Sequence, residues 1–344
     1  MKSIKHIHIV FALLFQMTLA ALAGPLVYEG KEGIGKGKHI VFIASDHEYR
    51  GEETCPAIAR ILAKRYGFKC TVLFGLDNDG YIKPGSSNIP GMEALDKADM
   101  MFLFLRFVAP NDASMKHFTD YLDRGGPVLG LRTTTHGFNK LKGKYAYYNF
   151  NSRNKDYDYG FGRQVLGETW RPREGAGHYG SNHKFSTRMF VVPDQKDHPV
   201  MRGVKDMHAM AGAYSAVPIE GSVILGKNQV LDSMKPDGKP LENKPPSPSI
   251  WVRTYKSTSG KGGRVFTSTQ GASEDIISEG VRRCIINGVF WCMGLEKNIK
   301  PDMNVAFVGP YQPTTFKFGG GAKQVKPADL AGWDSPIMPR GGKK

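Results

Sequence analysis

Cysteine is scarce in this chain of 344 residues, and its few thiols follow no metal-binding pattern. The four cysteines are Cys55, Cys70, Cys284 and Cys292, without the paired spacing that is typical of zinc sites. Cys284 and Cys292 belong to one predicted helix, where about 12 Å of rise separates them, too far for a disulfide. Cys55 and Cys70 flank opposite ends of another predicted helix. The sequence therefore predicts free, mostly buried thiols.

Long apolar runs are also lacking after the start of the chain, which argues against a membrane-spanning helix. The start itself combines Lys2 and Lys5 with an apolar stretch over residues 9–22 and a small-x-small pattern at 21–23, followed by Gly24. This order is typical of a secretory signal peptide, and the apolar stretch is short for a membrane anchor. We expect a signal peptide over residues 1–23, a linker over 24–37, and export to the periplasm or the extracellular space.

Acidic residues are fewer than basic ones, and the net charge is +15. Such a charge suits acidic partners, among them anionic glycans, nucleic acids and membrane surfaces. The basic residues are scattered along the sequence, however, and no basic stripe with interleaved aromatic residues is present. The pattern therefore argues against nucleic-acid binding.

Apolar runs alternate with amphipathic, capped segments through the first half of the chain. This alternation predicts an α/β fold with a doubly wound, mostly parallel sheet and helices on both faces. We expect one domain over residues 38–297, with loop insertions after residue 138 and an irregular tail rich in Gly, Pro and Lys over residues 298–344. The predicted strands are 38–44, 70–74, 100–105, 128–131, 164–170, 189–192, 222–225, 250–255 and 264–268, and a long helix is expected from Ser273 to Leu295.

Polar side chains follow three of the predicted parallel strands at the point where each strand ends. Ligands of open α/β sheets bind outside the carboxyl ends of the strands, so we expect these side chains to share one crevice. Histidines and carboxylates there suit general acid–base catalysis, and arginines suit the stabilisation of developing negative charge. The candidate catalytic residues are His47, Glu48, His136 and His183, and the candidate substrate-binding residues are Asp46, Arg50, Arg106, Arg132, Trp170, His178 and Tyr179.

Other roles for these residues stay open at the level of sequence. The acids and arginines would also form a structural ion-pair network, and Glu52 and Glu53 suit the start of a helix. Histidines with acids would equally hold a divalent metal, although the spacing of His178 and His183 does not match a helical zinc pair. Trp170 and Tyr179 suit either sugar stacking or ordinary packing.

No serine or cysteine nucleophile follows the strand that ends at Leu131. Thr133 and Thr134 occupy the place where a strained elbow would present the nucleophile. Threonine is a poor nucleophile without special activation. The sequence therefore argues against acyl transfer through a covalent intermediate.

Six short motifs stand in a characteristic order along the chain. They are SDHEYRGEE at 45–53, IPGMEAL at 89–95, GLRTTTH at 130–136, GETW at 167–170, GRVFTS at 263–268 and NGVFW at 287–291. Together these motifs resemble secreted ThuA-like (trehalose-utilisation-like) proteins. The resemblance covers residues 38–295 and implies a flavodoxin-like fold of the class I glutamine amidotransferase type. It also implies a role in carbohydrate metabolism, especially on glycosides and 3-keto-sugars, with a sugar or glycan as the small-molecule partner.

Two departures from the family pattern limit what the resemblance implies. The elbow cysteine of the amidotransferases is missing, so glutaminase activity is not expected. Many relatives carry Gly-His after the last strand, where this chain reads Thr-Gln-Gly-Ala at 269–272. If that histidine takes part in the chemistry elsewhere in the family, this protein either lacks it or uses His178 or His183 instead.

Three functional hypotheses follow. The first is an exported enzyme that isomerises, eliminates or hydrolyses a glycoside or 3-keto-sugar by acid–base chemistry. The second is a non-catalytic glycan-binding module, and the third is a structural or envelope-associated protein. For the first, we expect replacement of His136 by Ala to leave folding largely intact and to reduce activity at least about tenfold.

Overall fold

Five parallel strands form one half of a ten-stranded sheet, in the order β3-β2-β4-β5-β10. The computed structural model describes residues 24–338, so the expected signal peptide lies outside the described residues. Four of these strands, β2 to β5, are largely apolar and buried almost throughout, as expected of strands covered on both faces. The five parallel strands are β2 (His39–Ser45), β3 (Lys69–Phe74), β4 (Met100–Leu105), β5 (Val128–Leu131) and β10 (Gly262–Ser268).

The other half of the sheet is antiparallel. Strands β9 (Ser247–Lys256), β8 (Val223–Val230), β6 (Thr187–Val191) and β7 (Met207–Ala209) continue outward from β10. At the opposite edge, β1 (Leu26–Glu29) pairs antiparallel with β3, inside the segment that the sequence suggested as a linker. The sheet as a whole is therefore mixed, and the prediction of adjacent parallel strands is confirmed for β2 to β5.

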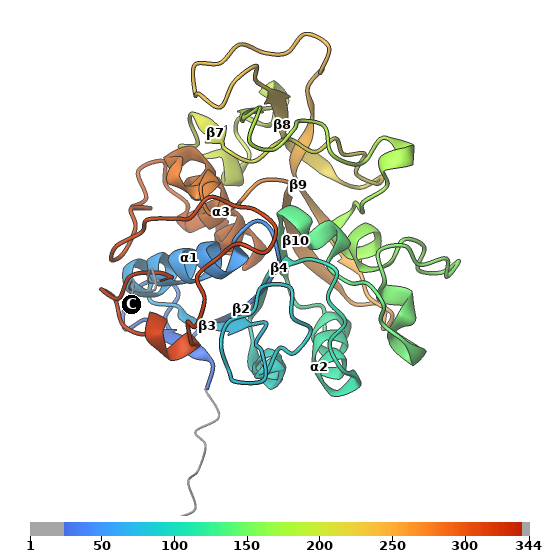
Figure 1. The fold of residues 1–344 in the computed structure, drawn as a ribbon, viewed down its shortest axis with the longest axis vertical. Helices are drawn as coiled ribbons and strands as arrows, with labels where there is room; N and C mark the ends of the chain where they lie inside the picture. The colour runs from blue at the N-terminus through green and yellow to red at the C-terminus, as the bar shows by residue number, and fades with distance from the viewer. Residues whose placement is uncertain (1–23, 339–344) are drawn as a thin grey trace, which may run out of the picture.

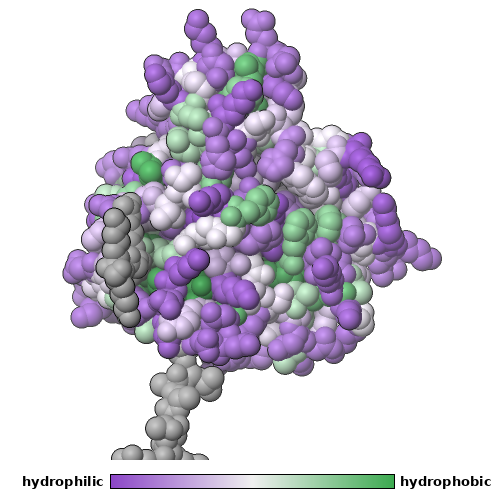
Figure 2. Space-filling view, in the orientation of Figure 1, coloured by the Kyte–Doolittle hydropathy of each residue, from purple (hydrophilic) through white to green (hydrophobic). Residues whose placement is uncertain are grey.

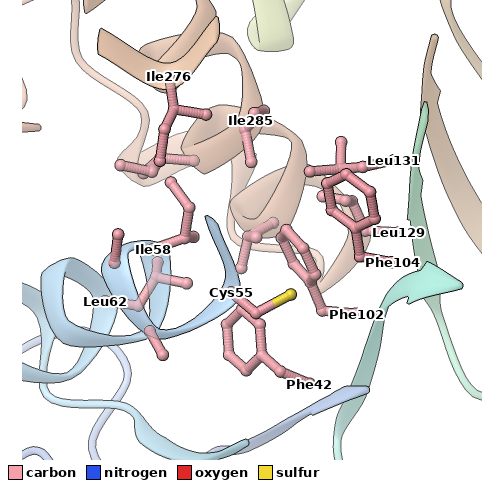
Figure 3. Close-up of a cluster of buried hydrophobic side chains, with 14 of the residues drawn as sticks. Phe42, Cys55, Ile58, Leu62, Phe102, Phe104, Leu129, Leu131, Ile276 and Ile285 are labelled. Carbon is pink, nitrogen blue, oxygen red and sulfur yellow. The ribbon is translucent and has the colours of Figure 1, made fainter. Parts of the chain in front are cut away.

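Helices cover both faces of the parallel half. On one face, α1 (Gly51–Tyr66) and α3 (Glu279–Cys292) pack against the strands, with Ile58, Phe42 and Ile285 in a shared core (Figures 1 and 3). On the other face, α2 (Asp112–Asp123) packs with the 3-10 turn Met92–Lys97 in a second core. Alternate strand residues point to opposite faces, so each strand feeds both cores.

Local signals in the sequence explain where two of these helices begin or end. The Asn111 side chain accepts a hydrogen bond from the backbone N–H of Ser114 and caps α2. Helix α1 ends at Gly67, whose φ of 79° suits a residue without a Cβ atom. All four cysteines are free and buried, which confirms the thiol prediction.

Two predicted elements differ in the structure. The expected strand over residues 164–170 is instead the π-helical turn Gly162–Leu166, whose last carbonyl accepts a hydrogen bond from the Trp251 indole. The expected helix from Ser273 is interrupted: a 3-10 turn spans Asp275–Ile277, Ser278 is extended, and α3 begins at Glu279. At this interruption the Asp275 carboxylate accepts hydrogen bonds from the backbone N–H groups of Gly271, Ala272 and Ala211.

The C-terminal segment wraps around the helical face over α1 and α3 (Figure 1, red). Arg282 donates to the carbonyl of Val305, and Arg60 donates to the carbonyl of Leu330. Apart from the 3-10 turn Pro327–Leu330, residues 300–338 form no regular element. Figure 2 shows polar side chains over most of one molecular face, with apolar residues in small patches. Within residues 24–338, no helix has the length and apolar character needed to span a bilayer.

Candidate functional site

The candidate site lies at the carboxyl ends of β2, β4 and β5. The chain runs from β2 to β3 on one side and returns to β4 on the other, so the strand order reverses between β2 and β4. Such a reversal is where open α/β sheets bind ligands. The backbone N–H of Arg106 donates to the Ser45 carbonyl at 3.1 Å, and that of Phe107 donates to the His136 carbonyl at 3.1 Å. These bonds hold the three strand ends together beyond the sheet.

Asp46 shapes the turn after β2. Its carboxylate accepts hydrogen bonds from the backbone N–H groups of Glu48 and Tyr49 and from the Thr133 hydroxyl. The residue is fully buried. Asp46 therefore fixes the backbone around His47 and is not placed to contact a ligand directly.

Glu48 and Arg106 form an ion pair between the ends of β2 and β4. Asn182 strengthens this arrangement: its Nδ2 donates to Glu48 Oε1 at 3.1 Å and to the Tyr49 hydroxyl at 2.8 Å. The Arg106 guanidinium lies over the Phe318 ring at 4.8 Å and near the Phe107 ring at 5.5 Å. Glu48 is thus a partner that positions Arg106 between two aromatic rings.

Arg132, which the sequence suggested as a substrate ligand, is completely buried. Its guanidinium is stacked between the rings of Tyr49 and Tyr214, at 4.0 and 4.3 Å from their centroids. Nη1 donates to the carbonyls of Gly212 and Thr269 and to the side chain of Gln270. No carboxylate pairs with Arg132 within the described chain. It supplies a fixed positive charge beneath the site.

His136 is also buried, with 1% of its surface exposed. Its ring lies 5.0 Å from Phe107, 5.1 Å from Trp170 and 6.3 Å from Tyr214, measured between centroids. Burial, followed by the charge of Arg106, holds the pKa of His136 well below its usual value. The imidazole is therefore neutral at neutral pH and sits behind the aromatic rings.

His47 is the strand-end histidine that keeps contact with solvent. It is half-buried, and its ring lies 5.4 Å from Phe318 and 6.5 Å from Phe107. Burial lowers the pKa of His47, and the charge of Arg106 lowers it further against the opposing effect of Asp46. A neutral imidazole beside a guanidinium is suited to accept a proton.

The cluster at the strand ends comprises His47, Glu48, Arg106, Arg132 and His136. The loop before β6 adds His178 to it, and the segment between β7 and β8 adds Tyr214. The exposed His178 meets Trp170 and Tyr214 edge to face, at 5.1 and 5.0 Å between centroids. Although part of the residue faces solvent, the packing of its ring among these neighbours removes water from the imidazole. This loss of water, followed by the charges of Arg132 and Arg106, lowers the pKa of His178 to about 4. Tyr214 is buried, and its hydroxyl has no hydrogen-bond partner among the described residues. The expectation that this loop approaches the strand ends thus holds for His178.

Three predicted site residues lie elsewhere. Arg50 turns toward the C-terminal segment, where its Nε donates to the Thr314 hydroxyl at 3.1 Å. His183 stacks on Phe316 at 4.7 Å, and Tyr179 donates to the carbonyl of Pro245 at 2.8 Å. The sequence could not separate these residues from the cluster, because their partners come from distant parts of the chain.

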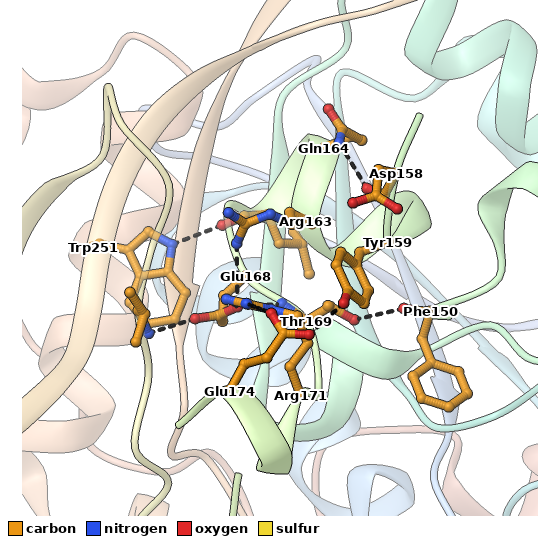
Figure 4. A network of polar contacts seen from close by, with 12 residues as sticks. Phe150, Asp158, Tyr159, Arg163, Gln164, Glu168, Thr169, Arg171, Glu174 and Trp251 are labelled. Carbon is orange, nitrogen blue, oxygen red and sulfur yellow. Dashed lines mark hydrogen bonds and ion pairs between the residues drawn. The ribbon is translucent and has the colours of Figure 1, made fainter. Parts of the chain in front are cut away.

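A separate polar network surrounds Glu168, two residues before Trp170 in the chain (Figure 4). Glu168 accepts hydrogen bonds from Arg171 Nη2 at 3.0 Å and from the backbone N–H of Thr169 at 2.8 Å. It also accepts from the backbone N–H of Val217. Glu168 therefore ties both neighbours of Trp170 to the antiparallel half of the sheet.

The sequence analysis missed four residues of the cluster: Phe107, Asn182, Tyr214 and Phe318. Phe107 was adjacent to a proposed residue and has a φ of 53°, but no pattern indicated the others. Residues 24–338 contain no group of three or more His, Cys, Asp or Glu side chains that is placed to hold a metal ion. The arrangement is one of neutral histidines, a paired arginine and aromatic rings.

Comparisons with known proteins give only distant likenesses. No family model and no curated protein matches the chain. A putative ThuA-like protein from Bacteroides uniformis is 18% identical, over 80% of this chain and 98% of its own, with a TM-score of 0.46. One from Parabacteroides merdae is 13% identical, over 82% and 98%, with a TM-score of 0.41. The chain is similar to proteins described as ThuA-like, the family that its motifs resemble.

Proposed function

We propose that this protein acts on a glycoside or 3-keto-sugar by acid–base chemistry at the ends of β2 and β4. One observation carries the proposal: the half-buried His47 ring and the Arg106 guanidinium both face the rings of Phe107 and Phe318. Flat aromatic faces suit the C–H surfaces of a pyranose ring. The titratable group, the cation and the stacking surfaces therefore meet in one place.

The roles follow from this geometry. His47 would remove the proton from the carbon next to the ketone, and the electron pair would move onto the carbonyl oxygen. Arg106, oriented by Glu48, would stabilise the negative charge on that oxygen. For isomerisation, His47 returns the proton to the former carbonyl carbon, and the hydroxyl proton of the deprotonated carbon moves to the oxyanion, so that the ketone forms at that carbon. For elimination, the carbonyl re-forms as the β-glycosidic oxygen leaves, and that oxygen takes the proton from the His47 imidazolium. His136 lies behind Phe107, where it would act on a ligand only after movement of the aromatic rings.

The second candidate is a glycan-binding module without catalysis. It is favoured by the burial of His136 and Arg132 and by the engagement of Glu48 with Arg106 and Asn182. These residues then hold a binding surface in place and take no part in chemistry. The two candidates share the same surface and differ in turnover.

Product analysis separates these candidates. The mature protein is incubated with glycosides and 3-keto-glycosides, with and without divalent metals. We expect conversion of a 3-keto-glycoside, reduced at least about tenfold by His47→Ala. The matched control His117→Ala alters a histidine that pairs with Asp96 on the surface and should retain activity. Binding without conversion would favour the binding module, and neither binding nor conversion would refute both.

We also propose that the parallel half is a flavodoxin-like unit and that the protein is exported. Numbered along the chain, its five strands follow the order 2-1-3-4-5, which is the flavodoxin-like order. The proposal of export rests on the charged and apolar start of the sequence. N-terminal sequencing of protein recovered outside the cytoplasm should begin at Gly24; recovery of the uncut chain in the cytoplasm would contradict export.

A further inference from the structure

Residues 314–324, here called the strap, cross the site although they lie far from it in sequence. The strap is anchored at its start, where Thr314 donates to Glu53 from its backbone N–H at 2.8 Å and also from its hydroxyl. Phe316 is fully buried and lies 5.3 Å from the Tyr49 ring. These contacts fix the strap to the first turn of α1.

Glycines let the strap pass close to the protein surface after this anchor. A Cβ atom on Gly320 would lie 1.8 Å from Nη2 of Arg50, which is itself buried. Gly319 has a φ of 63°, and its backbone N–H donates to the His47 carbonyl at 3.3 Å. The strap is therefore held against the turn that carries His47.

Phe318 is presented outward by this arrangement. It is 60% exposed, although its ring is held 5.4 Å from His47 and 4.8 Å from the Arg106 guanidinium. Burying a side chain of this size is favourable, so an exposed aromatic ring in a fixed position offers a surface for binding.

A pocket of about 420 Å³ lies between the strap and the loop around Tyr81. His47 forms part of its wall, and Asp77, Lys83 and Gln324 add polar groups. The volume falls in the range of about 300–1,000 Å³ that is typical of ligand pockets. His47 thus borders this pocket as well as the cluster around Arg106.

We infer that Phe318 and this pocket form a subsite for the second ring of a disaccharide or larger glycoside. The inference rests on the proposed function, in which the first ring lies over Arg106 and Phe107. Carboxylate, ammonium and amide groups match the hydroxyl groups of a sugar, and the Phe318 ring matches its apolar face. The strap thereby selects glycosides over single sugars.

Binding measurements on the mature protein test the subsite. The probes are trehalose, maltose and cellobiose with their 3-keto forms, compared with glucose and 3-keto-glucose, by calorimetry. We expect Phe318→Ala to weaken disaccharide binding about fivefold more than it weakens monosaccharide binding. Phe318→Trp, which keeps a flat ring, should retain binding. Phe190→Ala, at another exposed phenylalanine on β6, is the matched control.

The outcomes separate the subsite from the proposed function. If the wild-type protein binds a disaccharide more tightly than the single sugar and only Phe318→Ala removes the difference, the subsite is supported. If sugars bind but Phe318→Ala weakens both classes equally or neither, the subsite is refuted while the proposed function stands. If no probe binds the wild-type protein, both are refuted. Circular dichroism of each variant checks that it is folded.

Discussion

His136 illustrates how burial changes what a single residue is expected to do. The sequence placed it at a strand end, and a polar residue there was expected to contribute little to the core. In the structure its imidazole is enclosed by Phe107, Trp170 and Tyr214, and its exposed fraction is 1%. Its loss would leave a cavity among these rings.

We therefore predict that His136→Ala lowers the free energy of unfolding by about 2 kcal/mol, because a buried ring is removed without replacement. Urea denaturation followed by tryptophan fluorescence measures the change. The control His117→Ala should stay within about 0.5 kcal/mol of the wild type. An unchanged midpoint for His136→Ala would show that the rings close around the site without cost.

Two titratable groups with shifted pKa values, His178 and Glu52, give the stability of this protein two opposing pH dependences. The pKa of His178 is lowered to about 4, so its contribution is complete above about pH 6.5 and is lost as the pH falls toward 4. Glu52 behaves in the opposite way: burial, and then Glu53, raise its pKa to about 8. The contribution of Glu52 to the free energy of unfolding is complete below about pH 4.5 and is lost as the pH rises through 8.

We predict that Glu52→Gln removes the second dependence. Both carboxylate oxygens of Glu52 are buried without a hydrogen-bond partner, so ionisation in the folded state is unfavourable. The variant should gain stability relative to the wild type as the pH rises from 5 to 8, by about 1–3 kcal/mol. Urea denaturation at several pH values measures this gain. Glu242→Gln, at an exposed position, should follow the wild type, and parallel curves for both variants would contradict the prediction.

At the scale of elements, the strap depends on one buried side chain. Phe316 is stacked between Tyr49 and His183, whereas Phe318 two residues later is exposed. The strap thus buries Phe316 and exposes Phe318, although in a regular extended segment residues two apart would share one face. Phe316 thus anchors the strap and leaves Phe318 free to contact a ligand.

We predict that Phe316→Ala lowers the free energy of unfolding by about 3 kcal/mol, the usual cost of removing a buried phenylalanine ring. Phe318→Ala should change it by less than about 0.5 kcal/mol. Thermal unfolding measures both, and limited proteolysis should cut Phe316→Ala within residues 314–324 first. Equal stability of the two variants would mean that the strap is not anchored by Phe316.

At the scale of the whole molecule, the two halves of the sheet have different tasks. The parallel half aligns the ends of β2, β4 and β5 at one edge, which brings His47, Arg106 and His136 together. The antiparallel half and its preceding loop bring His178 and Tyr214 to the same edge. The site therefore depends on both halves.

The burial of the four cysteines in the core predicts that their thiols react slowly. The four thiols are buried, and burial raises the pKa of each, to about 12 for Cys284. A thiol reacts as the thiolate, so we expect almost no alkylation of the native protein near pH 8. After denaturation without reductant, mass spectrometry should show four modified cysteines. Rapid modification of the native protein, or a disulfide, would contradict this packing.

The sequence by itself determined the parallel strands, several helix ends and the polar residues at the strand ends. These features depend on neighbours within a few positions: continuous apolar runs, a capping Asn111, a Gly67 that ends α1. They also sufficed to indicate that His47, Arg106 and His136 lie at one edge.

Only the tertiary structure decided which of these side chains face solvent and which segments complete the site. Arg132 can be buried because the carbonyls of Gly212 and Thr269 accept its hydrogen bonds. Arg50 lies outside the cluster, where its Nε donates to the Thr314 hydroxyl. Phe318 reaches the site from more than two hundred residues along the chain. Burial, and with it the lowered pKa values of His47, His136 and His178, arises from contacts between segments that no local pattern relates.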